Sequence, residues 1–466
     1  KATLFLNVSE KEGIRPGYEL KLNSYDLGVD IELNDIIQRI RFEHPKVKVV
    51  ILTSRQERNF SAGANIYMLG SSEHSWKVNF CKFTNETRNS FEDSSNSGSL
   101  KFIAALNGVC AGGGYEIALA CNEIILIDDR ASTVSLPEVP LLGVLPWTGG
   151  LTRLIDKRKV RKDIADLFCT NADGVRGKKA LDWGLVDFIA IPSKFMELIN
   201  QRVLRLSKTP NLRNGKKGIT LKKLNRSFSN DSFKYNFVSA EIDREKRTVN
   251  IHITGPKKDD NVDIEQAEQL GSNWWPLQFA RELDDVILML RTNELDIGLI
   301  SLTSSGNLEY TLEVSNKLYA NKQNWFINEV IGMLRRTFSR LDVSSRSIFT
   351  IVDNGSCFGG VLAELLFLSD RTYMLNNEFN DDKTVKGPFI ALNELNFNCF
   401  KMVNDQTRLE TRFISDDIKI DELKDIINKK LNAKEAFLES LVTIIPDDLD
   451  WSEEIRLSIE ERISFS

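Results

Sequence analysis

Two carboxylates in this chain follow tight turns, at positions where they could handle protons. Glu116 closes the segment Cys110-Ala-Gly-Gly-Gly-Tyr-Glu116, and Glu138 closes Ser135-Leu-Pro-Glu138. A third turn, Ser61-Ala-Gly-Ala-Asn65, lies upstream. Backbone N–H groups in such turns can stabilise negative charge on a carbonyl oxygen, and glycines let the backbone approach a ligand closely. The pattern predicts acid–base chemistry beside a polarised carbonyl group.

Each of these features also has an ordinary explanation. A run of glycines is more often a flexible turn than an anion site, and Glu116 alone could be a solvated helix residue. However, Glu116 is the only charged residue of Tyr115–Cys121. An unpaired carboxylate in an apolar run is costly, and such carboxylates cluster at functional sites. We therefore favour a functional role for Glu116. Glu138 is a candidate only because the two glycine turns and Glu116 occur with it.

The elements that must position these groups can be read from the adjacent segments. Val47–Thr53 and Phe102–Leu106 are apolar or β-branched runs, typical of buried strands, and each leads toward one of the two glycine turns. The segment from Tyr115 to Cys121 reads as a helix that starts at the second turn. Backbone donors and a helix N-terminus would then face one point.

The turns resemble the crotonase superfamily, also called the enoyl-CoA hydratase/isomerase family. Ser61–Asn65 and Asn107–Glu116 are similar to its two oxyanion loops, and Ala180–Asp187 is similar to its closing helix-to-strand segment. The resemblance implies an α/β fold, a crotonase-like ββα superhelix. It also implies an oxyanion hole from the N–H groups of Ala64 and Gly113, with Glu116 and Glu138 as catalytic residues. The implied substrate-binding residues are Ala62, Gly63, Asn65, Gly112 and Pro137.

Longer segments are similar to one branch of this family, whose members open an oxygenated, dearomatised benzoyl-CoA ring with water. These segments are residues 22–30, 74–88, 136–146, 274–277 and 281–285. The resemblance implies a carbon–carbon lyase with an acyl-CoA substrate, either the 2,3-epoxide or the 2,3-dihydrodiol. The products would be an unsaturated semialdehyde acyl-CoA and formate. It implies a homodimer, and no cofactor beyond the CoA of the substrate.

Two alternatives stay open. One is a general enoyl-CoA hydratase or isomerase acting on aliphatic substrates. The other is a non-catalytic CoA-binding protein, which Trp147 favours because the family usually has glycine after the proline at 146. Tryptophan does not adopt positive φ cheaply and does not leave the space that glycine leaves.

Cys81 stands where the lyase resemblance implies a catalytic cysteine near the substrate. Trp76–Arg88 reads as a helix that places Val78, Cys81 and Asn85 on one face. A buried cysteine is usually only a small apolar residue. Contact with the substrate and a packing role are equally supported, and a nucleophilic role is less favoured.

An internal repeat organises the whole chain. Residues 32–54 align without gaps on residues 282–304, an offset of 250, and Gly108–Gly113 aligns on Gly355–Gly360 at an offset of 247. In this register Ala363 replaces Glu116, so we expect a tandem duplication whose degenerate second copy has a packing or dimerisation role. We assign residues 1–206 to the catalytic domain, 207–236 to a basic polar linker and 237–466 to the second domain.

The basic run from Lys208 to Arg226 holds seven basic residues and no acidic one. It reads as a solvated linker rather than a phosphate site. Other candidates for holding CoA phosphates are Lys157–Arg161 and the pair Arg55 and Arg58. The sequence does not choose among them.

Composition limits the function classes further. A net charge of −5 argues against a nucleic-acid-binding surface. The six cysteines lack paired spacing and there are only three histidines, so neither disulfides nor a metal site is expected. The apolar stretch Phe102–Ile127 contains Glu116, Asn122 and Glu123, and so predicts a folded core rather than a membrane span. We expect a cytoplasmic enzyme whose termini have been trimmed, because the sequence begins at Lys1.

Overall fold

The computed structural model describes residues 1–98, 100–210, 212–377 and 387–465. The chain divides into two compact units, Lys1–Ile219 and Thr220–Ser466. Each unit is built around its own sheet and is described by itself.

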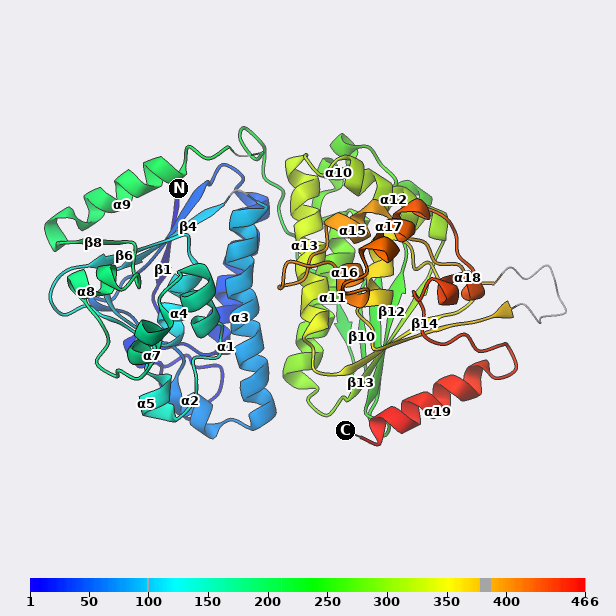
Figure 1. Cartoon of the computed structure of the whole chain (residues 1–466), viewed down its shortest axis with the longest axis horizontal. Helices are drawn as coiled ribbons and strands as arrows, with labels where there is room; N and C mark the ends of the chain where they lie inside the picture. Colours follow the sequence, from blue (N-terminus) through cyan, green and yellow to red (C-terminus); the bar gives the residue numbers. More distant parts are fainter. Residues whose placement is uncertain (99, 211, 378–386, 466) are drawn as a thin grey trace. The chain divides into compact units, whose positions relative to one another are not determined.

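The first unit centres on a five-stranded parallel sheet (Figure 1). Its strand order is β1-β2-β4-β6-β8. Strands β2 and β4, which the sequence predicts as the runs 47–53 and 102–106, are buried almost throughout and almost continuously apolar, as expected for parallel strands covered on both faces. The strands are β1 (Ala2–Leu6), β2 (Val49–Ser54), β4 (Lys101–Leu106), β6 (Glu123–Ile127) and β8 (Phe188–Ala190).

Helices cover both faces of this sheet. Helix α9 (Pro192–Leu206) packs Phe195, Ile199 and Val203 against one face. Helices α1 (Leu27–Glu43) and α3 (His74–Asn96) pack against each other, and α3 contacts β4. The remaining helices are α2 (Ile66–Ser71), α4 (Gly113–Ala120), α5 (Glu138–Leu142), α6 (Gly150–Thr152), α7 (Lys162–Cys169) and α8 (Gly177–Asp182).

A small second sheet gives the unit its repeating character. Strands β3 (Arg58–Ser61), β5 (Gly108–Ala111) and β7 (Val134–Ser135) are parallel, in the order β3-β5-β7. Each follows a strand of the large sheet and precedes a helix, giving β2-β3-α2, β4-β5-α4 and β6-β7-α5. These are three successive ββα turns, and they confirm the predicted crotonase-like superhelix.

The second unit repeats the large sheet and extends it. Its strand order is β15-β14-β13-β12-β11-β10-β9, in which β12 to β15 are parallel and β9 to β12 antiparallel. Strand β13 lies at the predicted offset of 250 from β2. The strands are β9 (Ser227–Phe228), β10 (Ser232–Lys234), β11 (Val238–Asp243), β12 (Thr248–Thr254), β13 (Leu299–Ser305), β14 (Ser347–Val352) and β15 (Arg371–Met374).

The helices of the second unit follow the same plan. Helices α11 (Trp275–Asn293) and α13 (Trp325–Asp342) pack together as α1 and α3 do, and α19 (Trp451–Ile463) covers Leu299, Phe349 and Tyr373. The others are α10 (Ile264–Leu270), α12 (Leu308–Ala320), α14 (Glu364–Phe367), α15 (Glu394–Asn398), α16 (Arg408–Arg412), α17 (Asp417–Asp425) and α18 (Ala433–Leu438). The fold therefore contains the predicted tandem duplication.

The alignment of the second copy needs a correction at its glycine turn. Gly360, with φ of +51°, donates its N–H to Ala391, as Gly112, with φ of +49°, donates to Ser135. The counterpart of Glu116 is therefore Glu364, and not Ala363 as the ungapped alignment predicts. The turn residue Gly360 comes eight residues after the end of β14, whereas Gly112 comes six residues after the end of β4, so two additional residues shift the register. Hydrogen bonding reveals this shift, and sequence identity does not.

The segment predicted to be a solvated linker, residues 207–236, is partly packed. The guanidinium group of Arg213 is buried and donates to the carbonyl oxygens of Ile40 and Arg41, both at 2.7 Å. It satisfies carbonyls that the end of α1 leaves unpaired. Strands β9 and β10 belong to the sheet of the second unit. Only part of the basic run from Lys208 to Arg226 can therefore be a solvated linker.

Candidate active site

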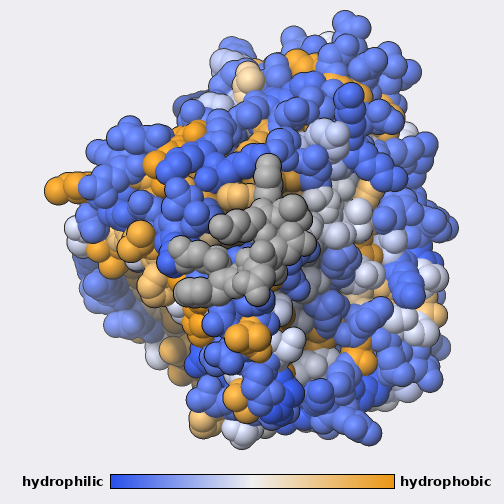
Figure 2. Space-filling model, turned by 90° about the vertical axis from the view of Figure 1, so that its right-hand side faces the viewer, coloured by the Kyte–Doolittle hydropathy of each residue, from blue (hydrophilic) through white to orange (hydrophobic). Residues whose placement is uncertain are grey.

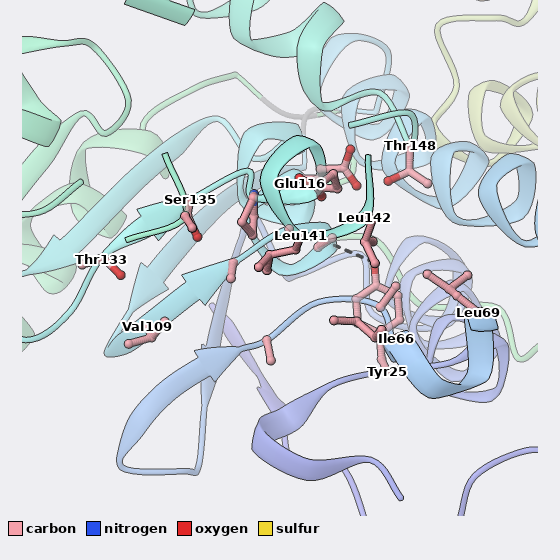
Figure 3. Close-up of a pocket in the computed structure, with 18 of the residues that line it drawn as sticks. Tyr25, Ile66, Leu69, Val109, Glu116, Thr133, Ser135, Leu141, Leu142 and Thr148 are labelled. Carbon is pink, nitrogen blue, oxygen red and sulfur yellow. Dashed lines mark hydrogen bonds between the residues drawn. The ribbon is translucent and has the colours of Figure 1, made fainter. Parts of the chain in front are cut away.

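A cavity of about 600 Å³ lies in the first unit, beside the three turns of the superhelix (Figure 3). Val109 and Ser135 of the small sheet line it, together with Thr133, which precedes β7. Ile66 and Leu69 of α2, and Leu141 and Leu142 of α5, give it an apolar side. Of the predicted substrate-binding residues, Ala62, Gly112 and Pro137 line the cavity, whereas Gly63 and Asn65 do not.

The first turn presents one backbone donor. Tyr25 pairs with this turn, because its N–H donates to Gly63 and its carbonyl accepts from Asn65, both at 3.0 Å. In a parallel bridge of this kind the intervening residue, Ala64, directs its N–H away from Tyr25. Gly63 has φ of +81°, and a Cβ there would lie 2.7 Å from the carbonyl oxygen of Ala111. Only glycine fits this turn.

The second turn brings a second donor close to the first. Gly113 begins α4, where a helix leaves its N–H groups unpaired. A Cβ built on Gly113 would lie 3.3 Å from the backbone nitrogen of Ala64, so the two backbones run side by side. Within the described residues, neither the Ala64 nor the Gly113 N–H donates a hydrogen bond to another protein group. This arrangement suits an oxyanion hole.

The side chain of Asn65 forms hydrogen bonds that support its own turn. Its Oδ1 accepts from the N–H of Met68 at 2.9 Å and thereby caps α2. Its amide donates to the carbonyl of Glu19 at 2.8 Å. Asn65 and Gly63 therefore shape the turn that carries Ala64.

Glu116 lies in the floor of the cavity and is 2% exposed. Its Oε1 accepts from the N–H of Gly150 at 3.0 Å, and its Oε2 lies 3.8 Å from Nη2 of Arg88. Burial raises the pKa of Glu116, and the positive charge of Arg88 opposes this rise. The carboxylate is thus held in place from two sides.

Glu138 is in a different environment, at the first residue of α5. Its Oε1 lies above Gly112, where a Cβ would approach it to 3.0 Å, and its Oε2 is buried without a hydrogen-bond partner. Burial, followed by the charge of Glu116, raises the pKa of Glu138 to about 7. Glu138 can therefore gain or lose a proton near neutral pH, whereas Glu116 is fixed by its partners.

Cys81 lines the cavity from α3, as the resemblance implies. Burial, and then the charge of Glu116, raises the pKa of its thiol to about 12. The thiol is therefore protonated at neutral pH, which argues against a thiolate nucleophile and fits a contact residue.

Sequence reasoning missed the arginines that hold the site together. Arg88 contacts both the second turn and Glu116. Arg153 donates to Asn85, Asn89 and Glu92 of α3 at 2.8, 2.6 and 3.1 Å, and to the carbonyl of Gly149 at 3.3 Å. The polar stripe Asn85, Asn89, Glu92, at helical spacing, is the signal that could have indicated a buried partner. It also explains why α3 extends to Asn96, beyond the predicted end at Arg88.

Trp147 does not distort its loop in the way that its sequence position predicts. Gly149, two residues later, takes the positive φ of +85°, whereas Trp147 is absent from the residues with positive φ. Its side chain is 51% exposed and borders the cavity. The loop therefore accommodates tryptophan, and a reason for suspecting a non-catalytic protein is removed.

Three of the candidate phosphate-binding groups form ion pairs. Lys157, Arg158 and Arg161 pair with Glu92, Asp187 and Asp163. Arg176, which the sequence did not single out, borders the cavity. Within the described residues, no cluster of three or more histidine, cysteine or acidic side chains is arranged to hold a metal ion.

Comparisons with known proteins place this fold and site in a family. The family model described as enoyl-CoA hydratase/isomerase matches residues 19–232. The chain belongs to the enoyl-CoA hydratase/isomerase family. It is 53% identical over 465 residues to the benzoyl-CoA-dihydrodiol lyase of Aromatoleum evansii, covering 100% of this chain and 83% of that protein.

Solved structures of the family match one part of the chain. An enoyl-CoA hydratase of Geobacillus kaustophilus is 37% identical, with a TM-score of 0.36, over 40% of this chain and 67% of that one. An enoyl-CoA hydratase of Bacillus anthracis is 27% identical, with a TM-score of 0.36, over 41% of this chain and 70% of that one.

Proposed function

We propose that this chain is a carbon–carbon lyase that opens the oxygenated ring of dearomatised benzoyl-CoA with water. The observation that carries the proposal is a pair of carboxylates in unequal environments, with Glu116 buried and Glu138 half-buried, beside two backbone N–H groups that have no partner among the described residues. The full-length similarity to a benzoyl-CoA-dihydrodiol lyase supports this substrate over an aliphatic one.

In this proposal the thioester oxygen binds between the N–H groups of Ala64 and Gly113. Charge that develops on this oxygen during ring opening is then stabilised by donors already in place. Glu138, with its pKa of about 7, transfers protons to and from the ring oxygens. Glu116, fixed by Gly150 and Arg88, orients the attacking water. Cys81 and Trp147 contact the ring from opposite elements of the cavity.

The reaction balances without an oxidant or a reductant. Water adds to the oxygenated ring, one carbon–carbon bond breaks, one ring carbon leaves as formate, and the remainder is an unsaturated semialdehyde acyl-CoA. A dihydrodiol takes up one water molecule in this process, and an epoxide takes up two. We therefore propose that no redox cofactor takes part, with CoA entering only as part of the substrate.

The assembly and the cellular location remain predictions. None of the described helices combines the length and apolar character that crossing a bilayer requires. Outside the part covered by grey atoms, the face in Figure 2 is largely hydrophilic, with single apolar side chains scattered over it. We propose a cytoplasmic homodimer, which light scattering after gel filtration tests. A monomer at micromolar concentration would refute the dimer.

The decisive assay measures formate release from benzoyl-CoA dihydrodiol and, separately, from the epoxide. Crotonyl-CoA hydration runs beside it as a control. Formate release with little hydration supports the proposal, and hydration alone assigns the chain to the general hydratases. Glu138→Gln should abolish formate release while acyl-CoA binding persists. A chain that binds acyl-CoA and does neither reaction would be non-catalytic.

A further inference from the structure

A single buried arginine lies under the candidate active site and touches most of its parts. The side chain of Arg88 is 1% exposed. Its Nη2 donates to the hydroxyl of Tyr25 and, at 3.0 Å, to the carbonyl of Gly113, and Nη1 lies 3.5 Å from the carbonyl of Thr148. The same Nη2 is 3.8 Å from Glu116. Arg88 itself does not border the cavity.

Tyr25 connects this guanidinium group to the other half of the oxyanion hole. Its backbone pairs with Gly63 and Asn65, which leaves the N–H of Ala64 directed away. Its hydroxyl reaches across to the carbonyl of Gly113 at 3.3 Å. Tyr25 is 3% exposed and so has little freedom to move. One residue therefore holds the turn of the first donor and touches the residue that carries the second.

Stability alone does not account for this arrangement. Burying a guanidinium group costs several kcal/mol, and well-packed apolar residues often replace buried ion pairs without loss of stability. Nε of Arg88 is buried without a hydrogen-bond partner, so the group is not even fully satisfied. A cation in this position is more costly than the packing requires, which points to a role in the chemistry.

We infer that Tyr25 and Arg88 are positioning residues, which lock the two donors of the oxyanion hole to each other and to Glu116. This inference rests on the proposed function, because the hole must act on a bound thioester. A displacement of about 1 Å in such a site can lower the rate by about 100-fold. Loss of the Tyr25 hydroxyl should therefore lower kcat and leave the fold intact.

Arg88 adds a charge to this geometric role. Its positive charge lowers the pKa of both Glu116 and Glu138, against the larger effect of burial. Removing the charge should raise both pKa values, whereas removing the Tyr25 hydroxyl should not. The other titratable groups around the pair are Asp30 of α1, Cys81 of α3, Arg153 after α6 and Cys169 of α7.

The test uses the full-length chain and a bound chromophore, para-dimethylaminocinnamoyl-CoA, whose absorption moves to longer wavelength when its carbonyl is polarised. The variants are Tyr25→Phe, Arg88→Lys and Arg88→Met. Thr84→Val is the matched control, because buried Thr84 bonds only carbonyls of its own helix. Each is also assayed for kcat, KM and the pH dependence of ring opening.

We expect Tyr25→Phe and Arg88→Lys to lose most of the wavelength shift and about 100-fold in kcat, with KM and the pH profile retained. Arg88→Met should lose the shift as well and move the pH profile to higher pH. Wild-type shift and kcat in both Tyr25→Phe and Arg88→Lys would overturn the inference, as would an equal loss in Thr84→Val. A wild-type chain that shifts the probe without opening the ring would refute the proposed function and leave this inference standing.

Discussion

At the residue scale, the half-buried carboxylate of Glu138 makes the free energy of unfolding depend on pH. Its pKa rises from 4.5 to about 7 on folding, so between these values the folded chain holds more protons than the unfolded chain. The contribution of Glu138 to the free energy of unfolding therefore decreases as the pH rises. Glu138→Gln should raise the free energy of unfolding above pH 7 by at most about 3 kcal/mol and change it little near pH 4. Chemical unfolding at several pH values measures this, and a difference independent of pH would contradict it.

Cys81 gives the second prediction at this scale. Because its pKa is about 12, the thiolate is scarce at neutral pH. Cys81→Ser should therefore keep formate release within about 10-fold of the wild type. Iodoacetamide should modify Cys81 slowly, and more slowly still when an acyl-CoA fills the cavity. Complete loss of turnover in Cys81→Ser would instead support a nucleophilic thiol.

At the scale of elements, α3 is connected through Arg153 to the turn that contacts Glu116. Arg153 joins the polar stripe of α3 to Gly149, the neighbour of the Gly150 N–H that holds Glu116. Arg153→Met should release this turn and lower kcat by about 100-fold. Lys157→Met is the control, because Lys157 shares the partner Glu92 and does not contact Gly149. Equal effects of the two substitutions would show that only Glu92 matters.

What the sequence predicts at this scale depends on how local each signal is. The glycine turns, Glu116 and Glu138 were found because turn chemistry and apolar strands are written into short segments. Tyr25 and Arg153 could not be found, because their partners are distant in the chain and only the fold brings them together. The register of Glu364 was missed for a related reason, since two additional residues between β14 and the turn leave the local pattern intact. The expectation that Trp147 distorts its loop was wrong, because Gly149, two residues later, adopts the positive φ.

At the scale of the whole molecule, the second unit retains a carboxylate, Glu364, at the position that corresponds to Glu116, but the partners of this carboxylate differ. Glu364 is 1% exposed and accepts from Arg408 and Asn396 at 2.6 and 2.8 Å. Burial raises the pKa of Glu364, and Arg408 opposes this rise. Both carboxylate oxygens are thus occupied, so this group is suited to support of the fold.

Because both oxygens of Glu364 have partners, we expect the loss of these partners to lower the stability of the second unit and to leave turnover unchanged. Arg408→Met leaves the buried Glu364 without its charged partner, also removes the ion pair with Asp342, and should destabilise the second unit by about 3–5 kcal/mol. Arg456→Met, which removes two exposed pairs, should cost less than about 1 kcal/mol. Urea unfolding measures both, and kcat of the folded protein should be unchanged in each. A loss of kcat in Arg408→Met would give the second unit a part in catalysis.

Each of the three ββα turns of the first unit carries one part of the candidate site. The first ends in the turn that carries Ala64, the second in the turn that carries Gly113 and Glu116, and the third in Glu138. Each part therefore lies on its own short segment between a strand of the small sheet and the next helix, and the large sheet supports all three. Substitutions in one of these segments can move one group and leave the positions of the other groups unchanged. Such a scaffold acquires new reactions in small, separately tolerable steps.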